Sequence, residues 1–161
     1  MSYTIPAQTH IGHVHLKVAD LKRALSFYKE LLGFEITQQY GDSAVFISAG
    51  GYHHHIGLNT WHSKNAEPSP VRSAGLYHLA IVYPTRKDLA TIFKRLEDEA
   101  YPLTGASDHG VSEAIYLNDP DGNGVELYWD RPRDNWPKDN TGNLWMGTKP
   151  LDIDSLLNEL A

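Results

Sequence analysis

The chain contains an internal repeat, and no other feature of its sequence restricts the possible folds as strongly. Apolar residues spaced like one face of an amphipathic helix occur in two separate segments. The two sets are Leu21, Ala24, Leu25, Tyr28 and Leu32 in the first segment, and Leu89, Ile92, Phe93, Leu96 and Ala100 in the second. Each set begins directly after an aspartate, Asp20 or Asp88, and aspartate favours a helix N-terminus. We therefore expect one helix after each aspartate.

Strand-like segments flank both predicted helices in the same order, which indicates a duplicated structural unit. One segment precedes each helix and three follow it: residues 10–18, 34–40, 43–49 and 53–59 in the first unit, and residues 75–83, 102–106, 112–117 and 124–129 in the second. Turn signals such as Gly50-Gly51 and the run N-D-P-D-G-N separate them. The pattern predicts an α+β fold in which two βαβββ modules form a curled mixed sheet around a cavity.

The repeat also sets the expected domain organisation. We expect a single domain over residues 1–161, with module one at about 9–61, a linker at about 62–74 and module two at about 75–131. The C-terminal tail, residues 132–161, begins irregularly and then predicts a short helix over residues 152–160. Its apolar residues are expected to pack on the domain or on a partner chain; they are Leu156, Leu157 and Leu160.

Cysteine is absent, whereas histidine occurs nine times among the 161 residues. The absence of cysteine excludes a disulfide framework, a thiolate zinc site, an iron–sulfur cluster and a cysteine nucleophile. Imidazole and carboxylate groups are then the strong metal ligands that the chain has to offer.

Charge and hydropathy exclude further classes of protein. The net charge is −6 and no run of Lys or Arg occurs, which argues against a nucleic-acid partner. No apolar segment approaches the ~20 residues of a membrane span, and the N-terminus lacks the pattern of a secretion signal. We expect a cytoplasmic protein that acts on a small molecule.

Two histidines and one glutamate lie at matching points of the repeat. His13 and His78 each belong to the strand-like segment before a predicted helix, and Glu126 lies between valine and leucine in another such segment. A buried carboxylate without a partner is costly, so Glu126 needs a ligand or a partner. Two imidazoles and one carboxylate form a 2-His-1-carboxylate metal site. Taken singly, His78 is also compatible with a structural core histidine, and Glu126 with a solvated position or a pair with Arg131.

Three runs carry a resemblance to a known family: G-H-V-H-L-K-V-A-D-L, F-Y-K-E-L-L-G-F and A-I-Y-L-N-D-P-D-G-N-G-V-E-L-Y. Together with the βαβββ repeat, and over about residues 10 to 131, they resemble the vicinal oxygen chelate superfamily of glyoxalases, fosfomycin and bleomycin resistance proteins and extradiol dioxygenases. The resemblance implies that His13, His78 and Glu126 hold a divalent metal in the cavity. Glyoxalase-type members add a fourth ligand, usually glutamate, on the last strand of the first module. Alignment puts His55 there, a departure that argues against glyoxalase activity.

The motifs fit the extradiol dioxygenases of this superfamily better. Those enzymes carry an acid–base histidine in a motif H-x-x-A/G-L, which H-H-I-G-L matches, and this implies the role for His54 with His55 as the near alternative. They also carry a tyrosine ten residues before the glutamate ligand, the position of Tyr116, and a histidine nine residues before that tyrosine. This chain has Ser107 there, and His109 two residues later is the candidate. The H-H-H run is also compatible with a solvated strand end, and Tyr116 with a core aromatic.

The resemblance implies an extradiol ring-cleaving dioxygenase, an oxidoreductase that acts on a catechol-type aromatic diol with O2. Fe(II) is the expected metal, with Mn, Ni, Zn or Co as alternatives, and a homodimer is the expected assembly. A glyoxalase-like metal-dependent isomerase or lyase is the alternative, and a non-catalytic drug-binding resistance protein is a further one. Aromatic residues that could shape the pocket are Tyr52, Trp61, Tyr128 and Trp129, and the histidines without an assigned role are His10, His15, His53 and His62.

Overall fold

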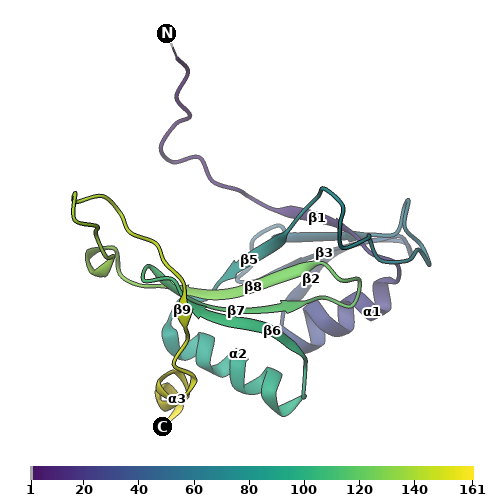
Figure 1. Ribbon diagram of the computed structural model, residues 1–161. Coiled ribbons are helices and arrows are strands. Elements are labelled where there is room, and N and C mark those ends of the chain that lie inside the picture. Colours follow the sequence, from purple (N-terminus) through teal and green to yellow (C-terminus); the bar gives the residue numbers. More distant parts are fainter. Residues whose placement is uncertain (1) are drawn as a thin grey trace. The chain divides into compact units, whose positions relative to one another are not determined.

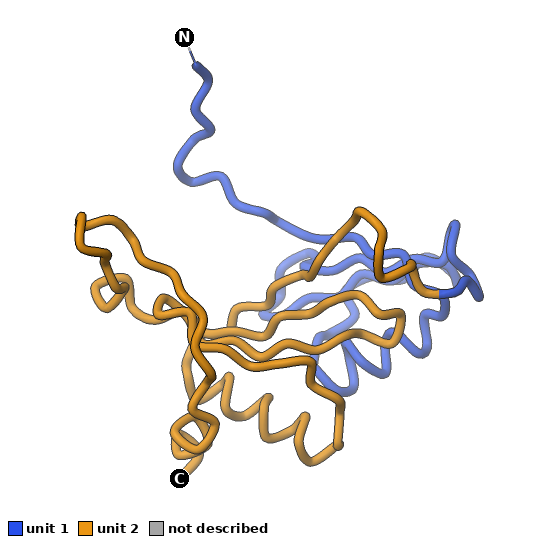
Figure 2. Tube along the Cα trace, viewed as in Figure 1, with its two compact units in different colours: residues 1–67 blue, residues 68–161 orange. Residues whose placement is uncertain are grey.

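The computed structural model describes residues 2–161, which divide between Glu67 and Pro68 into two compact units, unit 1 and unit 2 (Figure 2). Unit 1 contains a four-stranded sheet and unit 2 a five-stranded sheet. Each unit has the order strand, helix and three strands, as the repeat predicts. The predicted α+β class and the two βαβββ modules are therefore confirmed.

Unit 1 consists of β1 (Val14–Lys17), α1 (Leu21–Leu25), a π-helix (Ser26–Leu31), β2 (Glu35–Tyr40), β3 (Ala44–Ser48) and β4 (Ile56–Asn59) (Figure 1). The strand order across its sheet is β1-β4-β3-β2. Strand β1 runs parallel to β4, and the other neighbours are antiparallel.

The first predicted helix changes its winding halfway along. Asp20 caps it as expected, because its carboxylate accepts a 2.7 Å hydrogen bond from the Arg23 N–H. From Ser26 onward the backbone forms a π-helix, in which the Leu32 N–H donates to the Phe27 carbonyl at 2.9 Å. A π-turn holds more residues than an α-turn, so the apolar stripe shifts in register. Ala24, Phe27 and Tyr28 are buried, whereas Leu21, Leu25 and Leu32 are only half-buried.

Unit 2 consists of β5 (His78–Val82), α2 (Arg86–Asp98), β6 (Leu103–Asp108), β7 (Ser112–Asn118) and β8 (Gly124–Asp130), followed by a tail with a 3-10 turn (Arg133–Asn135), β9 (Lys149–Pro150), α3 (Ile153–Leu157) and a second 3-10 turn (Asn158–Leu160). The strand order is β5-β8-β7-β6-β9, with β5 parallel to β8 and the other neighbours antiparallel. The sequence predicted the C-terminal helix but not β9, whose two residues carry too little pattern to be recognised.

Helix α2 begins earlier than the sequence predicted. Thr85 is its N-cap, and Asp88 lies inside the first turn, where the two residues form a reciprocal capping box. The predicted stripe is otherwise confirmed, since Leu89, Ile92, Phe93 and Leu96 are all buried. Ala100 lies beyond the helix in a left-handed conformation with φ of 49°.

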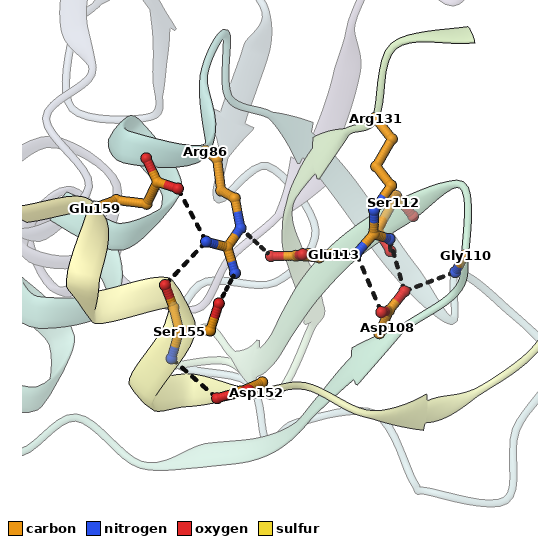
Figure 3. Close-up of polar contacts among 9 residues, drawn as sticks. All are labelled: Arg86, Asp108, Gly110, Ser112, Glu113, Arg131, Asp152, Ser155 and Glu159. Carbon is orange, nitrogen blue, oxygen red and sulfur yellow. Dashed lines mark hydrogen bonds and ion pairs between the residues drawn. The ribbon is translucent and has the colours of Figure 1, made fainter. Parts of the chain in front are cut away.

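A network of charged side chains fastens the C-terminal tail to unit 2 (Figure 3). Glu113 on β7 is only 4% exposed and accepts hydrogen bonds from Arg86 at 2.8 Å and from Arg131 at 2.7 Å. Arg86 also donates to the Ser155 carbonyl at 2.9 Å and to Glu159 at 3.0 Å. A buried carboxylate is tolerated because two guanidinium groups pair with it, and the same contacts hold α3 beside α2.

The predicted cavity concerns how the two units are arranged, so it stays a prediction, as do the single domain and the module boundaries. Within residues 2–161, no helix has the length and apolar character needed to cross a bilayer.

Candidate functional site

The two faces of the sheet in unit 2 differ in character. Alternate side chains on one face are buried, among them Leu79, Ile115, Leu117, Val125 and Leu127, and α2 contacts β8. Because side chains alternate along a strand, the other face carries His78, Tyr116 and Glu126. The β7–β8 register places Tyr116 directly opposite Glu126. Alternation thus explains how a strand with a buried apolar side presents a carboxylate on its other side.

His78 and Glu126, two of the predicted metal ligands, lie together. The Nε2 atom of His78 is 2.9 Å from Oε2 of Glu126, and the Glu126 side chain is 13% exposed. The alternative in which Glu126 pairs with Arg131 is wrong, because Arg131 pairs with Asp108 and Glu113 instead. An imidazole nitrogen and a carboxylate oxygen that converge in this way are the donors that a divalent transition metal takes.

Tyr116 extends this pair. Its hydroxyl donates to Oε1 of Glu126 at 3.1 Å. Burial raises the pKa of Tyr116 to about 12, with the Glu126 charge and this hydrogen bond adding to the effect. The phenol therefore keeps its proton at neutral pH and acts as a hydrogen-bond donor beside the carboxylate.

His109 extends the chain of contacts by one further group. It lies directly after β6, and its Nε2 atom is 2.7 Å from the Tyr116 hydroxyl. The residue at the spacing typical of the extradiol enzymes, Ser107, is still within β6. Because His109 lies in the turn, its ring reaches the phenol despite the altered spacing. Unit 2 thus contains a continuous polar chain, His109–Tyr116–Glu126–His78, which we call the relay.

In unit 1, His13 and His54 make a ring contact. His13 immediately precedes β1 and His54 lies shortly before β4, and their ring centroids are 4.4 Å apart. Burial, followed by the neighbouring imidazoles, of which His13 contributes most, lowers the pKa of His54. Phe46 on β3 packs against His54 with a centroid distance of 4.9 Å. Sequence analysis did not single out Phe46, although its place in an alternating strand was visible.

His55 has a different environment from His54. Its Nδ1 atom is 3.0 Å from the Ser48 hydroxyl and accepts the Ala49 N–H at 3.3 Å. The segment of residues 53–59 is not strand throughout, since β4 begins only at Ile56. The three successive histidines therefore lie in a loop, where strand alternation does not govern them. Between the two candidates for the acid–base role, the contact with His13 favours His54.

The strand register identifies which residue of unit 1 corresponds to Glu126. In unit 2, Ala80, two residues after His78, pairs with Glu126. In unit 1, His15, two residues after His13, pairs with Gly57. The position equivalent to Glu126 is therefore Gly57 and not His55 as the sequence alignment had it.

The imidazole of His15 occupies the space beside Gly57. A Cβ atom added at Gly57 would come 2.8 Å from Cδ2 of the His15 ring. The ring also packs against Phe46 and Trp61, with centroid distances of 5.6 and 5.5 Å. Of the other aromatics proposed to shape a pocket, Tyr52 packs on His53 and His55, and Tyr128 follows Glu126 on the same face of β8.

A divalent metal needs several donor groups that converge on one point. Across residues 2–161, no three His, Cys, Asp or Glu side chains are gathered into a metal-holding group. His78 and Glu126 fit the donor chemistry of a divalent metal as a pair, and both are in unit 2. The third predicted ligand, His13, belongs to unit 1, so the complete ligand set stays a prediction.

Residues 10–127 match the Glyoxalase/Bleomycin resistance protein/Dioxygenase superfamily, and the chain belongs to this superfamily. Solved structures agree on the fold: a glyoxalase/dioxygenase from Nostoc punctiforme superposes with a TM-score of 0.64 at 16% identity, covering 82% of this chain and 99% of that one.

Two proteins similar in sequence to this chain are dioxygenases. The chain is 41% identical over 157 residues to catechol-2,3-dioxygenase of Bacillus subtilis (strain 168). These residues cover 97% of this chain and 54% of that protein. The chain is 28% identical over 120 residues to biphenyl-2,3-diol 1,2-dioxygenase 3 of Rhodococcus globerulus, covering 74% of this chain and 63% of that protein. The chain thus spans between about half and two thirds of the length of these relatives.

Proposed function

We propose that this chain acts as a metal-dependent extradiol ring-cleaving dioxygenase on a catechol-type aromatic diol and O2. The observation that carries the proposal is the relay, in which a phenol and an imidazole continue directly from the His78–Glu126 pair. The similarity to catechol-2,3-dioxygenase over nearly the whole chain supports the same activity.

The proposal assigns the metal to His13, His78 and Glu126. Once bound, a divalent metal with open coordination positions supplies a common site for both diol oxygens and for O2, with Fe(II) expected and Mn, Ni, Zn or Co as alternatives. The carboxylate of Glu126 would balance part of the metal charge, and before substrate binds its hydrogen bond keeps Tyr116 beside the metal-binding pair.

The chain's own acid–base groups have distinct roles in the proposal. Tyr116 is a neutral phenol whose single proton is donated to Glu126 in the metal-free chain; in the proposal it turns to a substrate oxygen once Glu126 holds the metal, with the His109 Nε2 atom on its other side. His54 transfers protons to and from the reacting oxygens, a role suited to an imidazole near neutral pH. The net reaction breaks the ring bond next to the diol and incorporates both atoms of O2 in the product.

The register of β4 favours this reaction over that of the glyoxalase-type members. Their additional ligand, usually a glutamate on the last strand of the first module, would correspond to Gly57, which has no side chain to offer. A metal-dependent isomerase or lyase and a non-catalytic binding protein are therefore kept as outcomes of the test. The homodimer and the cytoplasmic location also stay predictions.

Anaerobic loading of the chain with Fe(II), followed by catechol or a bicyclic diol in an oxygen electrode, tests the proposal. We expect one O2 consumed per diol and a ring-opened product that contains both oxygen atoms, with Mn, Ni, Zn and Co loaded in parallel to identify the metal. Absence of oxygen uptake with mono- and bicyclic diols would refute the dioxygenase. Thioester formation from a hemithioacetal would instead identify an isomerase, and diol binding that persists in His13→Ala without metal would identify a binding protein.

A further inference from the structure

The tail of unit 2 passes across the turn that carries His109. This segment, residues 136–148, connects the 3-10 turn after β8 to β9, and we call it the strap (Figure 1). At its start, the Trp136 indole N–H donates to the Arg131 carbonyl at 2.8 Å. After its end, β9 pairs with β6, with Lys149 opposite Asp108. The strap is therefore held at its start by Arg131, which follows β8, and beyond its end by the pairing of β9 with Asp108, the residue before His109.

Within the strap, Gly147 makes two hydrogen bonds to His109. The Gly147 N–H donates to the His109 carbonyl at 3.2 Å, and the Gly147 carbonyl lies 2.7 Å from Nδ1 of the His109 ring. One bond fixes the backbone of the histidine and the other fixes the orientation of its ring. The relay thus continues from the imidazole into the backbone of the strap.

The indole ring of Trp145 packs against both the strap and the turn that carries His109. A Cβ atom added at Gly147 would lie 2.2 Å from the Trp145 ring, and one added at Gly110 would lie 3.0 Å from it. Gly110 also has a φ of 80°, which favours glycine. The indole therefore packs against the backbone on both sides of the contact between His109 and Gly147, where two glycines make room for it.

The contact has a chemical consequence for the imidazole. A carbonyl oxygen only accepts hydrogen bonds, so Nδ1 must carry a proton to bond with it. The nitrogen facing Tyr116 is then Nε2. Because the Tyr116 hydroxyl has a single proton, it donates to Nε2 when that nitrogen carries no proton, and to Glu126 when Nε2 is itself protonated. We infer that the strap is a positioning element, in which Trp145 holds the Gly147 carbonyl against His109 and so keeps Nε2 directed at Tyr116 as the exchangeable nitrogen of the relay. The inference concerns the same site as the proposed function and rests on it for its catalytic meaning.

The tautomer of His109 tests the inference without any measurement of activity. Long-range 1H–15N spectra of the full chain, recorded with Zn²⁺ at a pH where the imidazoles are neutral, report which ring nitrogen is protonated. His109→Asn identifies the resonance by its loss. We expect the wild-type ring to be protonated at Nδ1, Trp145→Ala to lose this preference, and Trp145→Phe, which keeps a ring over Gly147, to restore it. Met146→Ala is the matched control, because Met146 is a 65% exposed neighbour on the same strap.

Protonation at Nε2 in the wild-type protein would overturn the inference, even if Trp145→Ala does not fold. An unchanged Nδ1 proton in folded Trp145→Ala would overturn the role of the indole. In the proposed reaction, we expect Trp145→Ala to lower kcat ~10–100-fold, the range seen when a partner behind a site residue is lost, with little change in KM. If the wild-type chain consumes no oxygen, the proposed function fails, whereas the spectra still decide the positioning role.

Discussion

The two units have the same topology but arrange their functional side chains differently. In unit 2 the relevant groups form a hydrogen-bonded series, from the strap through His109, Tyr116 and Glu126 to His78. In unit 1 the imidazoles of His13, His15 and His54 contact other rings. A duplicated backbone therefore supplies equivalent positions, and the side chains at those positions decide which unit contains the hydrogen-bonded relay.

The clearest difference is an exchange of volume between paired strands. Unit 2 has small Ala80 opposite large Glu126, and unit 1 has large His15 opposite Gly57. In unit 1 the ring of His15 fills the space that Gly57 leaves. At this position unit 1 therefore has a packed imidazole ring where unit 2 has a carboxylate.

Replacement of the carboxylate in unit 2 should have the largest effect. In Glu126→Gln we expect oxygen uptake to fall to background and the metal retained per chain to drop, because the proposed metal site loses its one carboxylate. Elemental analysis and the oxygen electrode measure both quantities. Glu35→Gln, at an exposed position of β2, is the matched control. Full metal content and turnover in Glu126→Gln would contradict the assignment.

The two adjacent histidines of unit 1 should separate in their effects. His54→Asn is expected to lower kcat ~10²–10⁴-fold, the usual contribution of a positioned acid–base group. His55→Asn is expected to keep most activity and to lower the free energy of unfolding by about 1 kcal/mol, because it disturbs the hydrogen bonds to Ser48 and Ala49. Steady-state kinetics and urea unfolding measure the pair. A larger loss of kcat in His55→Asn would reverse the assignment.

The volume exchange predicts a specific coupling between two strands. Gly57→Ala should destabilise unit 1 by about 1–3 kcal/mol, because its methyl group meets the ring of His15. His15→Ala in the same chain should relieve part of that loss, and a double-mutant cycle by urea unfolding measures the coupling. Additive effects of the two substitutions would mean that the His15 ring is not the cause of the destabilisation in Gly57→Ala.

The smallest expected effect is a pH dependence in unit 2. Burial alone would raise the pKa of Asp108, but hydrogen bonds from Arg131 and the Gly110 N–H, with the Arg131 charge, outweigh it and lower the pKa. A carboxylate with a lower pKa in the folded state stabilises the protein above its unfolded pKa of about 4, and this stabilisation is lost as the pH falls through the folded value. Asp108→Asn should therefore unfold with a shallower dependence on pH below about 4 than wild type. Equal slopes in urea titrations would argue against this pair as a source of acid sensitivity.

Local patterns in the sequence account for the features predicted correctly. The apolar stripe of α2, the Asp20 cap and the turn between β7 and β8 depend on neighbouring residues alone, so periodicity and turn chemistry were sufficient to predict them. His109 and Tyr116 were placed in one site by resemblance, and their contact within unit 2 agrees with that placement.

The features that sequence analysis missed depend on contacts between distant parts of the chain. The π-helix changes which side chains are buried without any local signal, and β9 exists through its pairing with β6. The contact of Gly147 with His109 involves a backbone carbonyl. Every residue has such a carbonyl, so the residue types do not predict this contact. The choice between His54 and His55 required knowing that β4 begins only at Ile56, because the alternation of a strand does not extend into the loop before it.

The contacts of Arg86 also bear on the order in which unit 2 folds. This one guanidinium bridges β7 and the C-terminal turn, and its partner Glu159 is 73 residues further along the chain. Contacts of such high sequence separation form late, because the entropy cost of closing a long loop precedes any stabilisation from the contact. The α3 segment should accordingly dock last and open first, so that its amides exchange with deuterium through a partial opening while those of β7 and β8 are still protected.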